Sequence, residues 1–211
     1  HLKKTYGRKR RTVVENAEEA VFEENKIEEQ EVVFLMDRFG YGKTVETSVY
    51  ERNKEAADSE NRYVIHCMNT GKLCLFTHDG KMHQIKVPDI PHGRFRDKGQ
   101  PIDNISNYQS SEERIVFLCE EEQFHSGKLL FVTKKGMMKQ VDGKEFLVAK
   151  RTIQATKLGE DDELISVQSV SETQNIVLRT EGDMFLKFPV SEVPEKKKGA
   201  VGVRGIRLQK Q

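Results

Sequence analysis

Lysine and arginine gather at three places in this chain, and each place follows a pair of short apolar segments. The candidate binding residues are Arg94, Arg96, Lys98, Lys150, Arg151, Lys157, Lys196, Lys197, Lys198, Arg204 and Arg207. These side chains neutralise phosphate groups, and the glycines that flank the first and third clusters allow a backbone to approach a charged surface closely. The sequence therefore predicts a surface that binds the nucleic-acid backbone without reading bases. A solvated loop is the alternative for each cluster, and three clusters at equivalent positions weaken it.

Residues that could perform a reaction form no convincing constellation. The acids Asp161, Asp162 and Glu163 occupy one contiguous turn, whereas a metal site usually draws its ligands from separate segments. The histidines show no ligand spacing, and the chain contains no P-loop sequence. We therefore expect no catalytic residue, no metal and no cofactor in this chain.

Charge is balanced in total but unevenly distributed. The 211 residues include 35 basic and 34 acidic side chains, which gives a formal net charge of +1. Residues 1–14 carry no acid, residues 15–31 are rich in glutamate, and the tail from Pro194 is basic again. Because local fields govern binding, the neutral sum does not exclude a nucleic-acid partner.

Cysteine usage and hydropathy indicate the compartment. Cys67, Cys74 and Cys119 form no CxxC pair, so we expect reduced, buried thiols and a cytoplasmic protein. The longest apolar run, Val32–Met36, is far too short to cross a bilayer, and no signal peptide precedes it. We expect no membrane partner.

A fourfold internal repeat positions the basic clusters. Each copy consists of an apolar strand, a short turn closing on glycine and a second, alternating strand, which is the pattern of a β-hairpin. The copies are Phe34–Val45, Leu75–Val87, Phe131–Val141 and Leu178–Phe188, with turn glycines Gly40, Gly80, Gly136 and Gly182. These glycines lie roughly 40–56 residues apart, a period typical of propeller blades.

The repeat predicts an all-β, propeller-like fold of about four blades, each a four-stranded antiparallel sheet that exchanges strands with its neighbours. The predicted blades cover residues 30–60, 61–111, 112–161 and 162–211, after a charged connector arm at residues 1–29. The first copy lacks a leading strand, as the first blade of a strand-exchanging array should. With the blades side by side, the three clusters would merge into one basic track around the rim.

Several motifs resemble one protein family. The tail Gly199–Leu208 (GAVGVRGIRL), the run Leu158–Ile165 (LGEDDELI) and the stretch Gly40–Lys43 (GYGK) are similar to the C-terminal domain of bacterial type IIA topoisomerase A subunits, that is, the A subunits of DNA gyrase and topoisomerase IV. Tyr6–Thr12 resembles the segment that joins this domain to the rest of those subunits, although Arg8 stands where the family usually has an acid. The resemblance implies a β-pinwheel whose basic perimeter binds and bends duplex DNA independently of sequence.

One motif of the family is absent. Gyrase carries the box Gln-Arg-Arg-Gly-Gly-Lys-Gly after the first hairpin, where it wraps DNA with a fixed chirality. This chain has Tyr50–Asp58 (YERNKEAAD) there, without glycine and with acids offsetting the cations. We therefore expect a topoisomerase IV-like domain. A gyrase A domain with a degenerate box that wraps DNA is the first alternative, and a propeller-type protein-interaction scaffold is the second.

The resemblance also implies partners and the location of the chemistry. The family's enzyme cuts DNA with a tyrosine preceded by arginine, but Arg62-Tyr63 opens a repeat strand here, so we expect no nucleophile in this chain. The parent would be an ATP-dependent isomerase that uses ATP and Mg on other domains. Its expected partners are double-stranded DNA, the topoisomerase B subunit, and the N-terminal breakage-reunion part of the same subunit, in the cytoplasm at the nucleoid.

Overall fold

The computed structural model describes residues 27–205 of the 211. The expected connector arm, apart from its last three residues, lies outside the described residues. The family-like stretch Tyr6–Thr12 and the candidate Arg207 also lie outside them.

Each predicted repeat forms an antiparallel hairpin. The hairpins are β1 (Glu31–Asp37) with β2 (Tyr41–Glu46), β4 (Lys72–Thr77) with β5 (Lys81–Lys86), β8 (Lys128–Thr133) with β9 (Met137–Asp142), and β12 (Asn175–Arg179) with β13 (Phe185–Pro189). Gly40, Gly80 and Gly136 have φ angles of 86°, 81° and 77°, the left-handed turn conformation that glycine adopts without steric cost. In the fourth turn Asp183 takes this conformation with φ 57°, so the prediction that this turn closes on Gly182 is wrong.

Strands of the following repeat complete each sheet, as the strand-exchange prediction requires. The added strands are β3 (Asn61–Met68) and β6 (Gln100–Pro101) in the first sheet, β7 (Ile115–Glu120) and β10 (Thr152–Gln154) in the second, and β11 (Leu164–Val170) and β14 (Val203–Arg204) in the third. The resulting orders are β3-β1-β2-β6, β10-β5-β4-β7 and β11-β8-β9-β14. We call these sheets A, B and C. Each sheet therefore combines a hairpin from one predicted blade range with strands from the next range.

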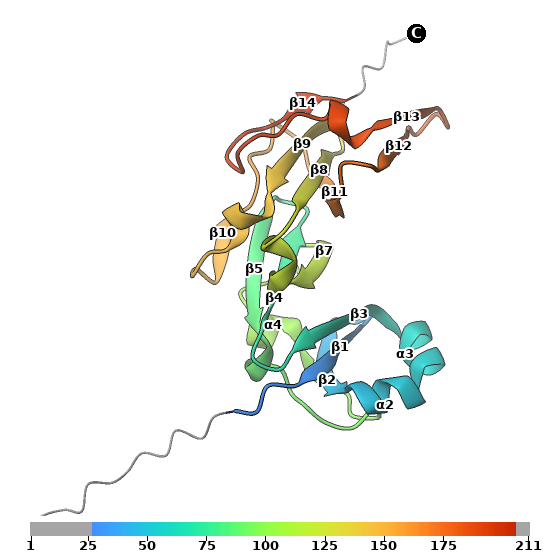
Figure 1. The fold of residues 1–211 in the computed structure, drawn as a ribbon, viewed down its shortest axis with the longest axis vertical. Coiled ribbons are helices and arrows are strands. Elements are labelled where there is room, and N and C mark those ends of the chain that lie inside the picture. Colours follow the sequence, from blue (N-terminus) through green and yellow to red (C-terminus); the bar gives the residue numbers. More distant parts are fainter. Residues whose placement is uncertain (1–26, 206–211) are drawn as a thin grey trace, which may run out of the picture.

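The all-β, strand-exchanged fold is confirmed. Sheets A, B and C follow one another along the long axis of the molecule, with sheet A at the lower end of the view and β12 and β13 at the upper right (Figure 1). Three sheets have the predicted four strands. Within residues 27–205 the fourth contains only β12 and β13, so the prediction of four strands per blade holds for three of the four.

Short helices occupy the links between strands. They are α2 (Thr47–Arg52), α3 (Lys54–Glu60), α4 (Ile102–Ile105) and the 3-10 turns η1 (Val87–Asp89), η2 (Glu121–Phe124), η3 (Gly143–Phe146) and η4 (Val190–Glu192). The sequence pattern predicts a second strand over Lys43–Val49 in the first hairpin, but β2 ends at Glu46 because α2 begins at Thr47. Tyr50 and Ala57 of α2 and α3 are buried against the face of sheet A. Across residues 27–205, no helix combines the length and apolar character needed to cross a membrane.

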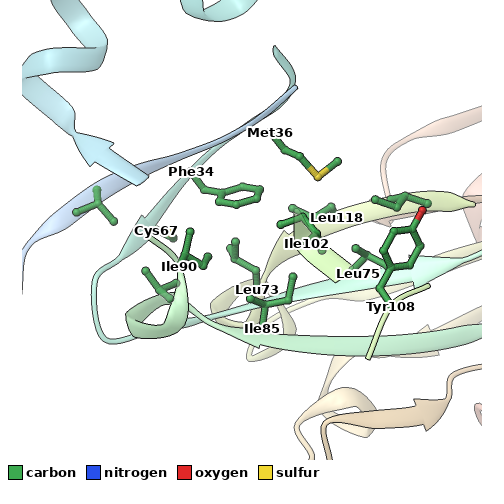
Figure 2. Packing of buried hydrophobic residues seen from close by; sticks show 13 residues of the cluster. Phe34, Met36, Cys67, Leu73, Leu75, Ile85, Ile90, Ile102, Tyr108 and Leu118 are labelled. Atoms are coloured by element: carbon green, nitrogen blue, oxygen red, sulfur yellow. The ribbon is translucent and has the colours of Figure 1, made fainter. Parts of the chain in front are cut away.

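Hydrophobic clusters join each sheet to the next. Phe34 and Met36 of sheet A extend toward Leu73, Leu75 and neighbouring side chains of sheet B (Figure 2). Between sheets B and C, Phe76 is the centre of an aromatic cluster, with ring centroids 5.5 to 6.1 Å from those of its neighbours. This burial holds the blades, and hence the connectors between them, in a fixed relation.

All three cysteines are buried and unpaired, which confirms the expectation of small buried hydrophobes. Burial raises the pKa of the Cys67 and Cys119 thiols to about 12. The thiols therefore stay protonated and unreactive at neutral pH.

Candidate nucleic-acid interface

The connectors after the second, third and fourth hairpins each return to the edge of the preceding sheet. In sheet A, His92 bridges to Thr44 in β2, and Gln100 pairs with Gly42 further along the same strand. The chain between these two contacts bulges away from β2. Arg94, Arg96 and Lys98 lie in this bulge, which we call loop A (residues 93–99).

Sheet C repeats this arrangement. Glu195 bridges to Gln140 in β9, and Val203 pairs with Met138 of the same strand. The bulge between these contacts, loop C (residues 196–202), contains Lys196, Lys197 and Lys198, and Arg204 follows in β14.

Sheet B has a tighter version. The Gln84 amide donates to the Arg151 carbonyl at 2.7 Å, and Thr152 pairs with His83 in β5. Lys150 and Arg151 therefore lie where β10 begins, and Lys157 follows its end. The three predicted clusters thus occupy the same edge of three successive sheets, beside the second hairpin strand.

The predicted side chains reach solvent. Apart from Arg207, which is not described, all of them are exposed except Lys198, which is half-buried. Lys198 belongs to the loop's own structure, because its amide and its ammonium donate to the carboxylate and the carbonyl of Glu145 at 3.0 and 3.1 Å. Lys197 lies 3.3 Å from the Glu145 carboxylate, and Arg151 lies 3.8 Å from that of Asp89.

The remaining cations are available for a ligand. Among residues 27–205, none of the following forms an ion pair: Arg94, Arg96, Lys98, Lys150, Lys157, Lys196 and Arg204. Two further lysines lie under the loops with their ammonium groups already used. Lys43 donates to the carbonyls of Phe95 and Asp97, and Lys139 donates to those of Lys197, Lys198 and Ala200.

Sequence reasoning missed Lys43 and Lys139. Both stand three residues after a turn glycine, in Gly40-Tyr41-Gly42-Lys43 and Gly136-Met137-Met138-Lys139, so the repeat marks them as equivalent positions but does not show what their ammonium groups contact. Burial lowers the pKa of Lys139 to about 8, against the opposing effect of the Glu145 carboxylate. Burial also lowers the pKa of Lys43, and nearby acids, chiefly Asp97, oppose that shift.

The aromatic residue among the loop A cations is an anchor. Phe95 packs against the buried cluster of Val33, Leu35 and Val45, and the Lys43 ammonium lies 5.3 Å from its ring centroid. These contacts fix loop A to the blade. Phe39, at the β1–β2 turn, is instead 73% exposed, with the Arg38 guanidinium 4.9 Å from its ring centroid. No sequence motif pointed to Phe39.

The residues that the sequence offered for catalysis or metal binding, Tyr63 and the Asp161–Glu163 turn, contact neighbouring parts of the fold instead. Tyr63 lies in β3, and its burial raises the pKa of its phenol, which is the opposite of activation for nucleophilic attack. The Asp161–Glu163 turn is held by neighbours: Asp162 accepts from the Lys135 amide at 3.0 Å, and Glu163 pairs with Lys134. Within the part of the chain that the structure describes, no group of three or more His, Cys, Asp or Glu side chains is placed to hold a metal ion.

The sheets and connectors define a class: an all-β, propeller-like domain with exchanged strands and a basic connector on the same edge of successive sheets. The family model described as DNA gyrase C-terminal domain, beta-propeller, matches residues 127–171 and 174–210. The chain belongs to the family of C-terminal β-pinwheel domains of bacterial type IIA topoisomerase A subunits, the family to which gyrase and topoisomerase IV contribute.

Individual relatives agree with this assignment. The DNA gyrase A subunit of Lawsonia intracellularis is 33% identical over 221 residues, a match that covers 99% of this chain and 27% of the relative. The C-terminal domain of DNA topoisomerase IV superposes with a TM-score of 0.76 and 25% identity, over 87% of this chain and 59% of the other. The E. coli ParC C-terminal domain is similar in fold, with a TM-score of 0.68 and 14% identity over 85% of this chain and 72% of the other. The chain spans about a quarter of the length of the curated relatives it matches.

Proposed function

We propose that this domain binds duplex DNA through its phosphates, independently of sequence, and bends it along the connector edge. The observation that carries the proposal is the recurrence of a basic connector on the same edge of sheets A, B and C. Exposed cations without ion pairs are the groups that displace counterions from DNA, and their regular repetition suits a curved, extended ligand. The bent segment would be presented to the cleavage gate in the N-terminal breakage-reunion part of the same subunit.

In this proposal the domain performs no chemistry. Its parent is an ATP-dependent type IIA topoisomerase in which other domains bind ATP and Mg and the B subunit is a partner. The raised pKa of the half-buried Tyr63 phenol and the local contacts of the Asp162 and Glu163 carboxylates support a binding role. We further propose a cytoplasmic, nucleoid-associated protein with no membrane partner.

We propose simple bending, as in topoisomerase IV, over wrapping. Where gyrase has its flexible cationic box, this chain forms α2 and α3, which are fixed by a Tyr50–Asp58 hydrogen bond of 2.9 Å and by buried Ala57. A short, folded and partly acidic segment is a poor substitute for a glycine-rich cationic loop. Wrapping by a gyrase-type domain is the second candidate, and the observation that favours it is that the curated relatives are named as A subunits of DNA gyrase.

A salt titration tests DNA binding. Contacts with about six to ten phosphates predict that affinity falls by at least ~10³ between low and moderate salt. The double substitution Arg94→Glu, Arg96→Glu should reduce the slope of log affinity against log salt by about two. The matched control, Arg52→Glu with Lys54→Glu, makes the same charge change on α2 and α3 and should leave the slope near wild type. A flat wild-type slope would refute DNA binding and favour a protein-interaction scaffold.

A topological assay separates the two candidates. The domain is bound to relaxed plasmid, the plasmid is ligated, and the writhe is read from a gel. Simple bending predicts no net writhe together with a bend measured by circular-permutation electrophoresis. Positive writhe would instead identify gyrase-like wrapping and overturn the topoisomerase IV-like proposal.

A further inference from the structure

Two lysines, Lys139 buried and Lys43 half-buried, hold the connector loops by the carbonyl groups of the loop backbone. The Lys139 side chain, only 1% exposed, donates at 3.2, 2.8 and 2.6 Å to the carbonyls of Lys197, Lys198 and Ala200 in loop C. Lys43 has the same place in sheet A, where it donates to the carbonyls of Phe95 and Asp97 in loop A, the latter at 2.6 Å. The same device therefore occurs twice, on repeats that differ in loop sequence.

These carbonyls determine the direction of the adjacent amides. In a planar trans peptide the carbonyl of one residue and the N–H of the next point in opposite directions. Carbonyls that point inward to an ammonium therefore turn the N–H groups of Arg96 and Lys98 in loop A, and of Gly199 and Val201 in loop C, away from it. Within residues 27–205 none of these four amides donates a hydrogen bond to the protein. The amide that follows the Lys197 carbonyl is the exception, because Lys198 N–H donates to the Glu145 carboxylate.

We propose that Lys43 and Lys139 are positioning residues that form loops A and C into two phosphate-binding sites, in which outward backbone N–H groups act beside the loop cations. This inference rests on the proposed function, since the phosphates are those of bound DNA. The outward amides belong to alternate residues of each loop, because the Asp97 and Ala200 amides between them donate within the loop to the Arg94 and Lys197 carbonyls. Backbone N–H groups that share one side of a loop attract an anion. The amides fix where a phosphate sits, and the flanking lysines and arginines supply the net charge.

Sheet B provides an internal contrast. The residue three positions after its turn glycine is His83, which contacts Thr152 and Glu113 and no loop carbonyl. The connector beside it has no glycine between Gly143 and Gly159, whereas loops A and C return to their strand through Gly99 and Gly202, with φ angles of 77° and 101°. The lysine and the glycine-containing bulge thus occur together, and sheet B contributes only side chains.

The charged groups around Lys139 set its response to pH. In η3 the Glu145 carboxylate faces it and pairs with Lys197, the Lys198 ammonium binds the Glu145 carbonyl, and from β8 the Phe131 ring centroid lies 5.5 Å away. Around Lys43 the acids are Asp97, Glu60 and Asp37. With a pKa of about 8, Lys139 loses its proton well before exposed lysines do.

The sign of this response is distinctive. Deprotonation weakens the hold on the loop carbonyls, so DNA affinity falls as the pH rises through about 8. The free energy of unfolding changes in the opposite direction. Between the folded-state pKa of about 8 and the ordinary lysine pKa of 10.5, Lys139 holds a proton in the unfolded chain but not in the folded one, so the free energy of unfolding increases as the pH rises. A residue with a merely structural role would not lower affinity while stability increases.

The experiment compares Lys43→Met, Lys139→Met with a control that removes the same charge from exposed sites, Lys54→Met, Lys134→Met. Affinity for a fluorescent duplex is measured by anisotropy at about pH 7. Loss of one hydrogen bond to a charged group changes a dissociation constant about tenfold. The test variant should therefore bind the duplex at least about tenfold more weakly than the control variant. Equal affinities of the two variants overturn the inference, whereas absence of salt-sensitive binding by the wild type refutes the proposed function itself.

A second measurement tests the same inference without the double variant, in case that variant does not fold. Wild type and the single variant Lys139→Met are titrated with duplex between about pH 7 and 9, with folding followed by circular dichroism. The wild type should lose about threefold in affinity and the variant should show a flat profile, because the titrating group is gone. Parallel profiles for the two proteins would show that another group titrates, and would overturn the role of Lys139.

Discussion

Replacement of Gly202 by alanine tests the geometry on which loop C depends. Gly202 has a φ of 101°, and a Cβ at this position would lie 2.6 Å from the Met138 carbonyl oxygen and 3.4 Å from the Lys139 Cβ. Neither neighbour is the free end of a side chain, so the backbone of β14 or of β9 must move. The substitution should separate β14 from β9 and release loop C.

The size of the effect follows from two contributions. A non-glycine residue at such a φ costs about 1–3 kcal/mol, and the clash adds the loss of the short ladder between β14 and β9. That ladder includes the 2.8 Å hydrogen bond from the Gly205 amide to the Gly136 carbonyl, worth about 1 kcal/mol net. We expect local stability to fall by about 2–4 kcal/mol in Gly202→Ala.

Hydrogen exchange measures this locally. Protection of the Gly205 amide should fall by about 30- to 1000-fold in Gly202→Ala, while amides of β1 in sheet A stay near wild type. The matched control is Gly199→Ala in the same loop, because a Cβ there meets no atom within 4 Å. Its protection and its unfolding free energy should stay within about 1 kcal/mol of wild type.

The outcome that refutes the reasoning is equal protection of the Gly205 amide in Gly202→Ala and Gly199→Ala. It would mean that the close approach of loop C to β9 does not require glycine. The account of how both glycine-containing loops return to their sheets would then be wrong.

Three further predictions concern the core and the buried charges. Phe76→Ala removes the ring that contacts four other phenylalanine rings, so the unfolding free energy measured in urea should fall by about 3–5 kcal/mol; a loss below about 1 kcal/mol would contradict its central place. Burial opposes ionisation of Glu113, but hydrogen bonds from Gln109, Lys81 and His83 hold the pKa of its carboxyl below the ordinary 4.5. The carboxylate therefore stabilises the fold above pH 4.5, and this stabilisation is lost as the pH falls through the lower pKa of the folded state. Glu113→Gln should lower the unfolding free energy by about 3 kcal/mol near neutral pH and flatten its decline at acidic pH, and an unchanged decline would contradict this role. The three buried thiols should resist a thiol reagent in the native protein at about pH 8 and react together in denaturant, and rapid native labelling of Cys67, with its pKa of about 12, would refute its burial.

Much of the fold could be predicted from the sequence because its signals are local. A glycine turn between alternating strands specifies a hairpin within about a dozen residues, and the four hairpins appear where this pattern occurs. The exceptions also have local causes. Asp183 adopts the left-handed turn conformation that was expected of Gly182, as short polar side chains can, and the strand pattern up to Val49 yields to a helix whose Tyr50 is buried against sheet A.

The support for the loops could not be predicted because it is nonlocal. A lysine in an alternating strand is expected to face water, yet Lys139 is buried because its ammonium finds three carbonyls about 60 residues further along the chain. The same applies to His83 and Glu113, which meet across 30 residues. Only the strand exchange, which brings each connector back to the previous sheet, places these groups together.

The lysines of this domain thus divide by what their ammonium groups contact, and the division connects the two experiments on DNA binding. The salt slope counts phosphate charges neutralised by cations, so exchanging Arg94 and Arg96 for glutamate alters the slope. Lys43 and Lys139 are already bound to backbone carbonyls, and the amides they orient are neutral. Their replacement by methionine should lower affinity at every salt concentration and leave the slope almost unchanged. If the slope changed by about two for both pairs, all four residues would contact DNA phosphates. The distinction between cations that bind phosphate and lysines that position the loop backbone would then be wrong.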